Sequence, residues 1–123
     1  MTKAKEFLSQ VRAEYKNVRE MRGRLSLGLN AAERRALRIL LKRAGAYYEE
    51  ILTDVWDVID MLPSKDDRDL LTLRFIYMES PDETARELGL KPSTVYSRQA
   101  KAVGRVQRIL NARERGETYE RVV

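Results

Sequence analysis

The feature that most constrains this chain is an apolar repeat that runs through residues 30–62. Its members alternate steps of four and three residues, which places them along one side of a helix; they are Leu37, Leu41, Ala44, Tyr48, Ile51, Val55, Val58 and Leu62. Asn30 and Glu33 resemble a capping box at the start, and Pro63 ends the helix because the residue before a proline avoids the α region. Such a helix is about 48 Å long and needs a partner along its apolar side.

A first amphipathic helix is expected from Met1 to about Arg24. Its apolar positions recur at steps of three, four and seven, near a heptad repeat; they are Leu8, Val11, Tyr15, Val18 and Leu25. Gly23 and Gly28 then mark a turn, because closely spaced glycines interrupt helices. Residues 1–62 are therefore predicted to form a long helical hairpin or coiled coil.

The charges of the second helix are divided between its two halves. The first half is basic and the second is acidic; the residues are Arg34, Arg35, Arg38, Lys42 and Arg43, then Glu49, Glu50, Asp54, Asp57 and Asp60. An antiparallel second copy would pair the basic half with the acidic half, which favours a homodimer through residues 30–62. A monomeric hairpin with the first helix satisfies the apolar repeat equally well, and both arrangements remain open.

Residues 63–113 are predicted to form a helix-turn-helix domain. Its first helix begins with Ser64 as a cap and with three aspartates, Asp66, Asp67 and Asp69. Compensation of the helix dipole explains these aspartates better than a cation site does, so no metal is expected. The inward face of this helix is formed by Leu70, Leu71, Phe75 and Met78. A short helix from Asp82 to Leu88 follows, and Arg74 is expected to form an ion pair with Glu83.

The spacing of Ala85, Gly89 and Val95 is typical of a helix-turn-helix. A small residue lets the second helix approach closely, and a glycine in the turn adopts a positive φ without steric cost. A β-branched residue one turn into the second helix fills the space between the two. Pro92 suits the first position of that helix, where its missing N–H costs nothing. A plain helical hairpin in a bundle can show the same spacing, so the turn alone does not indicate DNA.

A basic stripe follows the turn. Its residues recur at steps of three and four and share one face of the helix; they are Arg98, Lys101, Arg105 and Arg108. The neighbouring face is apolar, with Val95, Ala102, Val106 and Ile109. Residues 91–123 carry eight Lys and Arg against three Glu, whereas residues 63–90 carry four against seven acidic residues. One face can therefore be buried while the next meets phosphate groups.

Four short motifs in the C-terminal half carry a resemblance to a known module. They are Leu73-Arg74-Phe75, Glu83-Thr84-Ala85, Leu88-Gly89-Leu90 and Lys101-Ala102. The stretch resembles region 4 of housekeeping-type sigma factors, which reads the upstream promoter element. The whole chain also resembles a family of short phage and prophage proteins of Gram-positive bacteria, which pair a helical N-terminal half with this module. Some of that family act as late-gene regulators of the autolysin-regulator type.

Three residues depart from the region 4 pattern. Thr84 replaces an aliphatic residue, and Lys91 replaces the Ser or Thr that usually caps the second helix, a cap worth about 1 kcal/mol. Arg98 stands where an aliphatic residue usually points inward, and its stem can lie across the edge of the core while its guanidinium reaches DNA.

These patterns predict a sequence-specific, double-stranded-DNA-binding regulator of transcription. Residues 92–99 would enter the major groove, where Arg is the best partner for guanine O6 and N7. The expected base-reading residues are Ser93, Thr94, Ser97 and Arg98, and the expected phosphate contacts are Lys91, Tyr96, Lys101, Arg105 and Arg108. The resemblance to region 4 also implies a contact with RNA polymerase. No segment resembles the part of a sigma factor that melts promoters, so an activator or adaptor is expected.

Composition excludes several other classes. The chain has no Cys and no His, which removes disulfides, thiolate zinc sites and the usual general base, so neither an enzyme nor a cofactor is expected. No signal peptide and no membrane-length apolar run is present, so a cytoplasmic protein with no membrane partner is expected. Residues 114–123 read as a tail after the last helix. Two alternatives remain: a small-terminase-like DNA-packaging subunit, and a coiled-coil interaction protein whose helix-turn-helix does not bind DNA.

Overall fold

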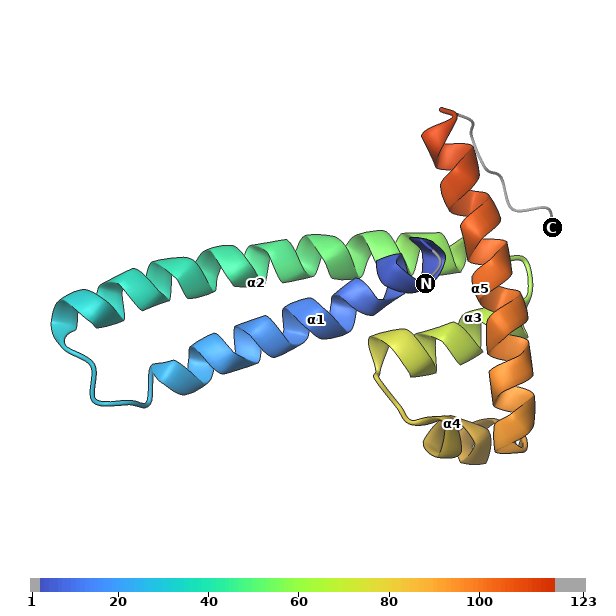
Figure 1. Cartoon of the computed structure of the whole chain (residues 1–123), viewed down its shortest axis with the longest axis horizontal. Coiled ribbons are helices and arrows are strands. Elements are labelled where there is room, and N and C mark those ends of the chain that lie inside the picture. Colours follow the sequence, from blue (N-terminus) through green and yellow to red (C-terminus); the bar gives the residue numbers. More distant parts are fainter. Residues whose placement is uncertain (1–2, 117–123) are drawn as a thin grey trace.

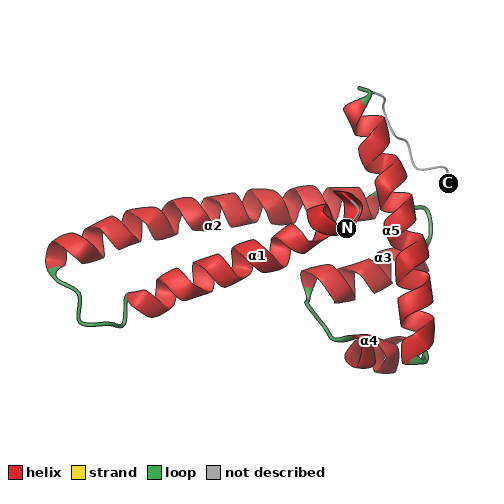
Figure 2. Ribbon diagram, in the orientation of Figure 1, coloured by secondary structure: helices red, strands yellow, loops and turns green. Residues whose placement is uncertain are grey.

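The computed structural model describes residues 3–116, which form helices joined by short loops and contain no strand (Figure 2). An all-α fold is thereby confirmed. Its elements are α1 (Lys3–Arg24), α2 (Ala31–Asp60), α3 (Lys65–Leu71), the π-helical turn η1 (Thr72–Ile76), α4 (Pro81–Leu88) and α5 (Pro92–Glu114). Residues 1–2 and most of the expected tail, 117–123, lie outside the described range.

Helices α1 and α2 lie side by side in opposite directions and form a long hairpin that projects from the rest of the molecule (Figure 1). The predicted cap at Asn30 is present, since its side chain accepts a hydrogen bond from the Glu33 N–H at 2.8 Å. In the middle of the hairpin the Tyr15 and Tyr48 rings meet at 6.1 Å between centroids. The expected intramolecular hairpin is therefore present in the single chain.

The apolar repeat of α2 is buried only near the base of the hairpin. Val55, Val58 and Leu62 are fully buried, whereas Leu37 and Leu41 are only partly covered. The base is enclosed by several helices, but the outer half of α2 has α1 alone beside it, and a single helix covers only one side of its neighbour. The outer part of the hairpin accordingly leaves apolar side chains in water, and these are Leu27, Ile39, Leu40 and Tyr47.

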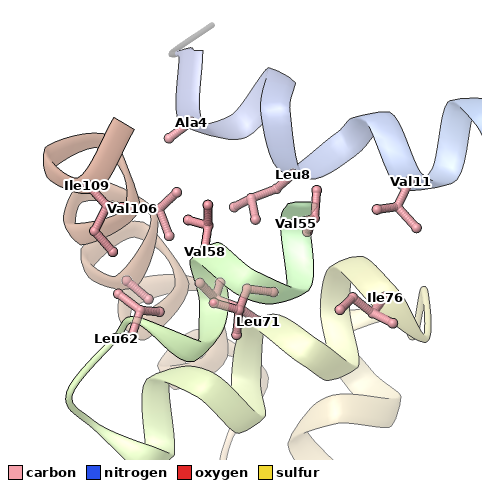
Figure 3. Packing of buried hydrophobic residues seen from close by; sticks show 12 residues of the cluster. Ala4, Leu8, Val11, Val55, Val58, Leu62, Leu71, Ile76, Val106 and Ile109 are labelled. Carbon is pink, nitrogen blue, oxygen red and sulfur yellow. The ribbon is translucent and has the colours of Figure 1, made fainter. Parts of the chain in front are cut away.

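Helix α5 crosses the base of the hairpin and closes one continuous core (Figure 3). The core unites both halves of the chain: Ala4, Leu8, Val11, Val55, Val58, Ile59 and Leu62 meet Leu71, Ile76, Ala102, Val106 and Ile109. The predicted boundary at residue 62 therefore separates the hairpin from the helix-turn-helix along the chain, but both share this core. The two parts should unfold together rather than as independent domains.

Polar contacts fix the start of α1 against α5. The backbone N–H of Ala4 donates to the Gln107 Oε1 atom at 2.8 Å, which satisfies one of the open donors at the helix start. The Lys3 ammonium lies 2.7 Å from the Glu114 carboxylate, and this hydrogen bond raises the pKa of Lys3. The sequence patterns did not predict either contact.

The segment between α3 and α4 differs from the sequence-based expectation. Helix α3 continues into the π-helical turn η1, where the Tyr77 N–H donates to the Thr72 carbonyl at 3.0 Å. The predicted ion pair between Arg74 and Glu83 is wrong. Arg74 instead donates to Gln99 Oε1 at 2.8 Å and to the Glu79 carbonyl. Glu83 forms a capping box with Ser80, and α4 begins at Pro81.

We expect Leu8→Ala to lower the free energy of unfolding by about 2–5 kcal/mol, because it leaves a cavity in the shared core. Leu8 is fully buried, whereas Leu27 at the hairpin tip is 58% exposed. Leu27→Ala is therefore the matched control and should change the free energy by less than about 0.5 kcal/mol. Urea unfolding followed by circular dichroism measures both. Equal effects of the two substitutions would contradict the described core.

Candidate nucleic-acid interface

A tight turn joins α4 to α5 as the residue spacing predicted. Gly89 has φ 66° and ψ 36°, in the left-handed region, and the Leu90 N–H donates to the Ala85 carbonyl at 2.8 Å. This arrangement ends α4 as a glycine-capped helix and leads the chain into α5 within three residues. Beneath the turn Ala85 and Val95 form a small apolar cluster with Leu70. The first turns of α5 are thus held against α3 and α4.

Thr84 is fully buried in α4 despite its hydroxyl group. Its Oγ1 atom donates to Glu79 Oε1 at 3.4 Å, so the polar atom has a partner in the protein. Partial burial and the nearby Glu87 raise the pKa of Glu79 above its usual value. The departure from the aliphatic pattern at this position is therefore accommodated without opening the core.

The first two turns of α5 present polar side chains to solvent. Most of the expected DNA-facing residues are exposed there, namely Lys91, Ser93, Tyr96, Ser97 and Arg98, while Thr94 is partly covered. The Lys91 side chain makes no hydrogen bond that caps α5, as expected where lysine replaces Ser or Thr. The Ser97 hydroxyl donates to the Thr94 carbonyl at 3.2 Å within the helix, which leaves its oxygen available as an acceptor. In Figure 1 this end of α5 lies beside α4 and away from the hairpin.

An open groove of about 630 Å³ separates the basic stripe of α5 from the start of α3. Its lining residues are Pro63, Ser64, Asp66, Asp67, Arg98, Lys101 and Arg105. Arg98 also borders a smaller cavity of about 70 Å³ beside Leu88 and Leu90. The Arg98 side chain therefore lies at the edge of the apolar cluster, as its position in the sequence led us to expect.

Arg105 differs from the expected free phosphate contact. Its Nη1 atom lies 2.7 Å from Asp67 Oδ2, and Asp67 is nearly buried, so this guanidinium neutralises a carboxylate of the protein itself. The spacing placed Arg105 on the correct face of α5, but it does not show which residue lies across the groove. Lys101 and Arg108 remain exposed on the same helix. The basic stripe thus meets an acidic edge on one side and solvent on the other.

Two glutamines on the rim of the buried face of α5 hold this helix in place, and the sequence patterns predicted neither contact. Gln99 accepts a hydrogen bond from Arg74 of η1, and Gln107 accepts one from the start of α1. An available signal was their position: polar amides that flank an apolar stripe often bond to a neighbouring element. These bonds fix the rotation of α5 and so determine which residues of the helix face outward.

Trp56 lies in the last third of α2. Its ring meets Tyr77 edge-on at 6.5 Å between centroids, and the tryptophan is 36% exposed.

Comparison with protein-family models, with curated proteins and with solved structures finds no significant match for this chain. Among residues 3–116, none of the helices is both apolar enough and long enough to cross a lipid bilayer.

We expect Gly89→Ala to destabilise the protein by about 1 kcal/mol, because an L side chain at φ 66° is strained. An added Cβ would meet no atom within 4 Å, so backbone conformation alone sets this cost. Gly104→Ala in α5 has the same free space and no positive φ; it should stabilise the helix by up to about 1 kcal/mol. Thermal unfolding of the two variants measures the contrast, and a shift of the same sign would contradict the turn geometry.

Proposed function

We propose that the chain is a sequence-specific DNA-binding regulator of transcription that inserts the start of α5 into the major groove. The observation that carries this proposal is the division of α5 into two faces. Val95, Ala102 and Val106 are fully buried, while the hydroxyl and guanidinium groups at the start of the helix are exposed. A rigidly held helix with such a polar end fits the major groove, which admits one α-helix.

The exposed side chains divide into two roles. Arg98 is the strongest candidate for reading a base, since its guanidinium matches guanine O6 and N7, with Ser93, Thr94 and Ser97 beside it. The phosphate contacts we propose are Lys91, Tyr96, Lys101 and Arg108, which supply salt-dependent affinity without sequence choice. Arg105 takes a supporting role, because its pairing with Asp67 joins α3 to α5.

The resemblance of this module to sigma region 4 supports a contact with RNA polymerase and a role as a phage or prophage late-gene activator. The acidic residues of α4 that face solvent, Asp82, Glu83 and Glu87, lie on the helix that precedes the reading helix. They would repel phosphate, which leaves α4 available for a protein partner rather than for DNA.

One observation favours a helix-turn-helix that does not bind DNA. Asp66 and Asp67 line the same groove as Arg98 and Lys101, and their charges oppose the approach of phosphate. Fluorescence anisotropy distinguishes the two functions, because labelled duplex would show no rise in anisotropy even at low salt if the module lacked DNA affinity.

We expect Arg98→Ala to weaken binding to a DNA site selected by the purified protein by about 10- to 100-fold, with little effect on random duplex. Lys101→Ala should weaken both, and should reduce the slope of log affinity against log salt by about 1. Arg22→Ala, on the exposed side of α1, is the matched control. Fluorescence anisotropy over a salt series measures all three. Absence of binding by the wild-type chain at 50 mM salt would refute the proposal.

We expect Asp67→Asn to strengthen DNA binding while it destabilises the fold. The amide still accepts a hydrogen bond from Arg105 but removes a negative charge from the groove, so the guanidinium becomes available to phosphate. Affinity should rise several-fold and the salt slope should increase in magnitude by about 1. Thermal unfolding should show a lower melting temperature. A loss of both stability and affinity would instead mean that the ion pair positions α5.

A further inference from the structure

The side of α2 that faces away from α1 is a continuous exposed surface, which we call the outer face of α2. It is made of residues at steps of three and four, all exposed: Arg35, Ile39, Lys42, Ala46, Glu50, Thr53 and Asp57. Ile39 is 56% exposed on this face. In Figure 1 only α1 lies beside the long helix over most of its length, and α5 crosses near its C-terminal end. This face is therefore free to contact a second helix along most of α2, and the arrangement of its charges determines which helix fits it.

The charges of this region are antisymmetric about Ala46. Four of the five basic residues before Ala46 have an acidic residue the same number of positions after it; the fifth, Arg34, has Val58 at that distance. The four matched pairs are Arg43 with Glu49, Lys42 with Glu50, Arg38 with Asp54, and Arg35 with Asp57. In an antiparallel pair of identical helices whose two-fold axis passes at Ala46, each residue meets the one equally far on the other side. Every one of these charges would then lie opposite its complement.

We propose that the outer face of α2 binds the same face of a second copy of this chain, antiparallel and centred on Ala46. In a parallel pairing the basic halves would face each other and repel, so charge selects the antiparallel orientation. The two-fold axis produces each of the four ion pairs twice. The small side chain of Ala46 allows the helices to approach closely where they cross.

The uncharged residues of the outer face supply the contact between these charges. Ala32, Ile39, Ala46 and Thr53 follow one another at intervals of seven, so they form one line along the helix. In the proposed register Ile39 of one copy lies opposite Thr53 of the other. Thr53 lines a shallow groove of about 500 Å³ in the acidic half of α2, with Ala46, Glu49, Glu50, Asp54 and Asp57. The partner's Ile39 side chain would enter this groove and leave water.

One carboxylate that lines this groove, that of Asp54, already has a partner within the chain. Asp54 lies 2.7 Å from Arg113 of α5, so its carboxylate is held in place before any partner binds. Exposed ion pairs are individually weak, so the charges determine orientation and register while the uncharged line contributes most of the affinity. The proposal depends on α2 alone and not on the DNA-binding function, which the start of α5 carries.

Charge exchange in the full chain tests the register. Wild-type protein is expected to self-associate in sedimentation equilibrium between 1 and 100 μM. Lys42→Glu and Glu50→Lys should each weaken the dimer at least tenfold, because each single change places like charges opposite each other. The double variant K42E/E50K should restore wild-type affinity, and an equimolar mixture of the two single variants should form a heterodimer. Arg22→Glu on α1 is the control and should leave the dimer unchanged.

Disulfide trapping tests the orientation, since the chain has no cysteine of its own. A mixture of Ile39→Cys and Thr53→Cys chains should oxidise to a mixed disulfide dimer, whereas either variant alone should do so far more slowly. Circular dichroism confirms that each exposed-site variant remains folded. A wild-type chain that is monomeric at 100 μM overturns the proposal. So does a double variant that stays as weak as the single variants, or preferential self-crosslinking at position 39.

Discussion

The packing of α5 across the base of the α1–α2 hairpin determines where every other part of this molecule lies. Ala102, Val106 and Ile109 enter the same core as Leu8 and Val58, so both halves of the chain share one apolar interior. Bonds from Gln99 and Gln107 then fix the rotation of the helix. Since α5 also carries the exposed basic and hydroxyl groups, loss of this packing would remove both the fold and the candidate binding surface.

Local chemistry made much of the fold predictable. The seam of α2, the cap at Asn30, the stop at Pro63 and the turn at Gly89 follow from periodicity and from the conformations that single residues allow. Contacts between distant residues were not predictable in this way. Periodicity placed Arg105 on the correct face but could not show that Asp67, which stands 38 positions earlier, faces it. The same limit explains why the predicted pairing of Arg74 with Glu83 was wrong. Arg74 bonds to Gln99 from a π-helical turn, and no local sequence pattern predicted that turn.

Charge is arranged differently at the two ends of the molecule. At the start of α5 the exposed groups are hydroxyls and cations bordered by two aspartates, which suits a polyanion approached from one side only. Along α2 positive and negative charges are separated lengthwise with almost no excess of either, which suits a partner with the same pattern reversed. The two surfaces lie on different helices, so occupation of one leaves the other uncovered.

Core packing does not fix the length of the outer part of the hairpin, in contrast to the rest of the described chain. Among the described residues, burial in α1 stops at Val18 and burial in α2 begins only at Val55, so no core residue sets the length of the arm beyond them. Adding seven residues to each helix would extend the arm by about 10 Å and return every side chain to its original face. A change of arm length by whole heptads would therefore leave α5 and the surface at its start where they are.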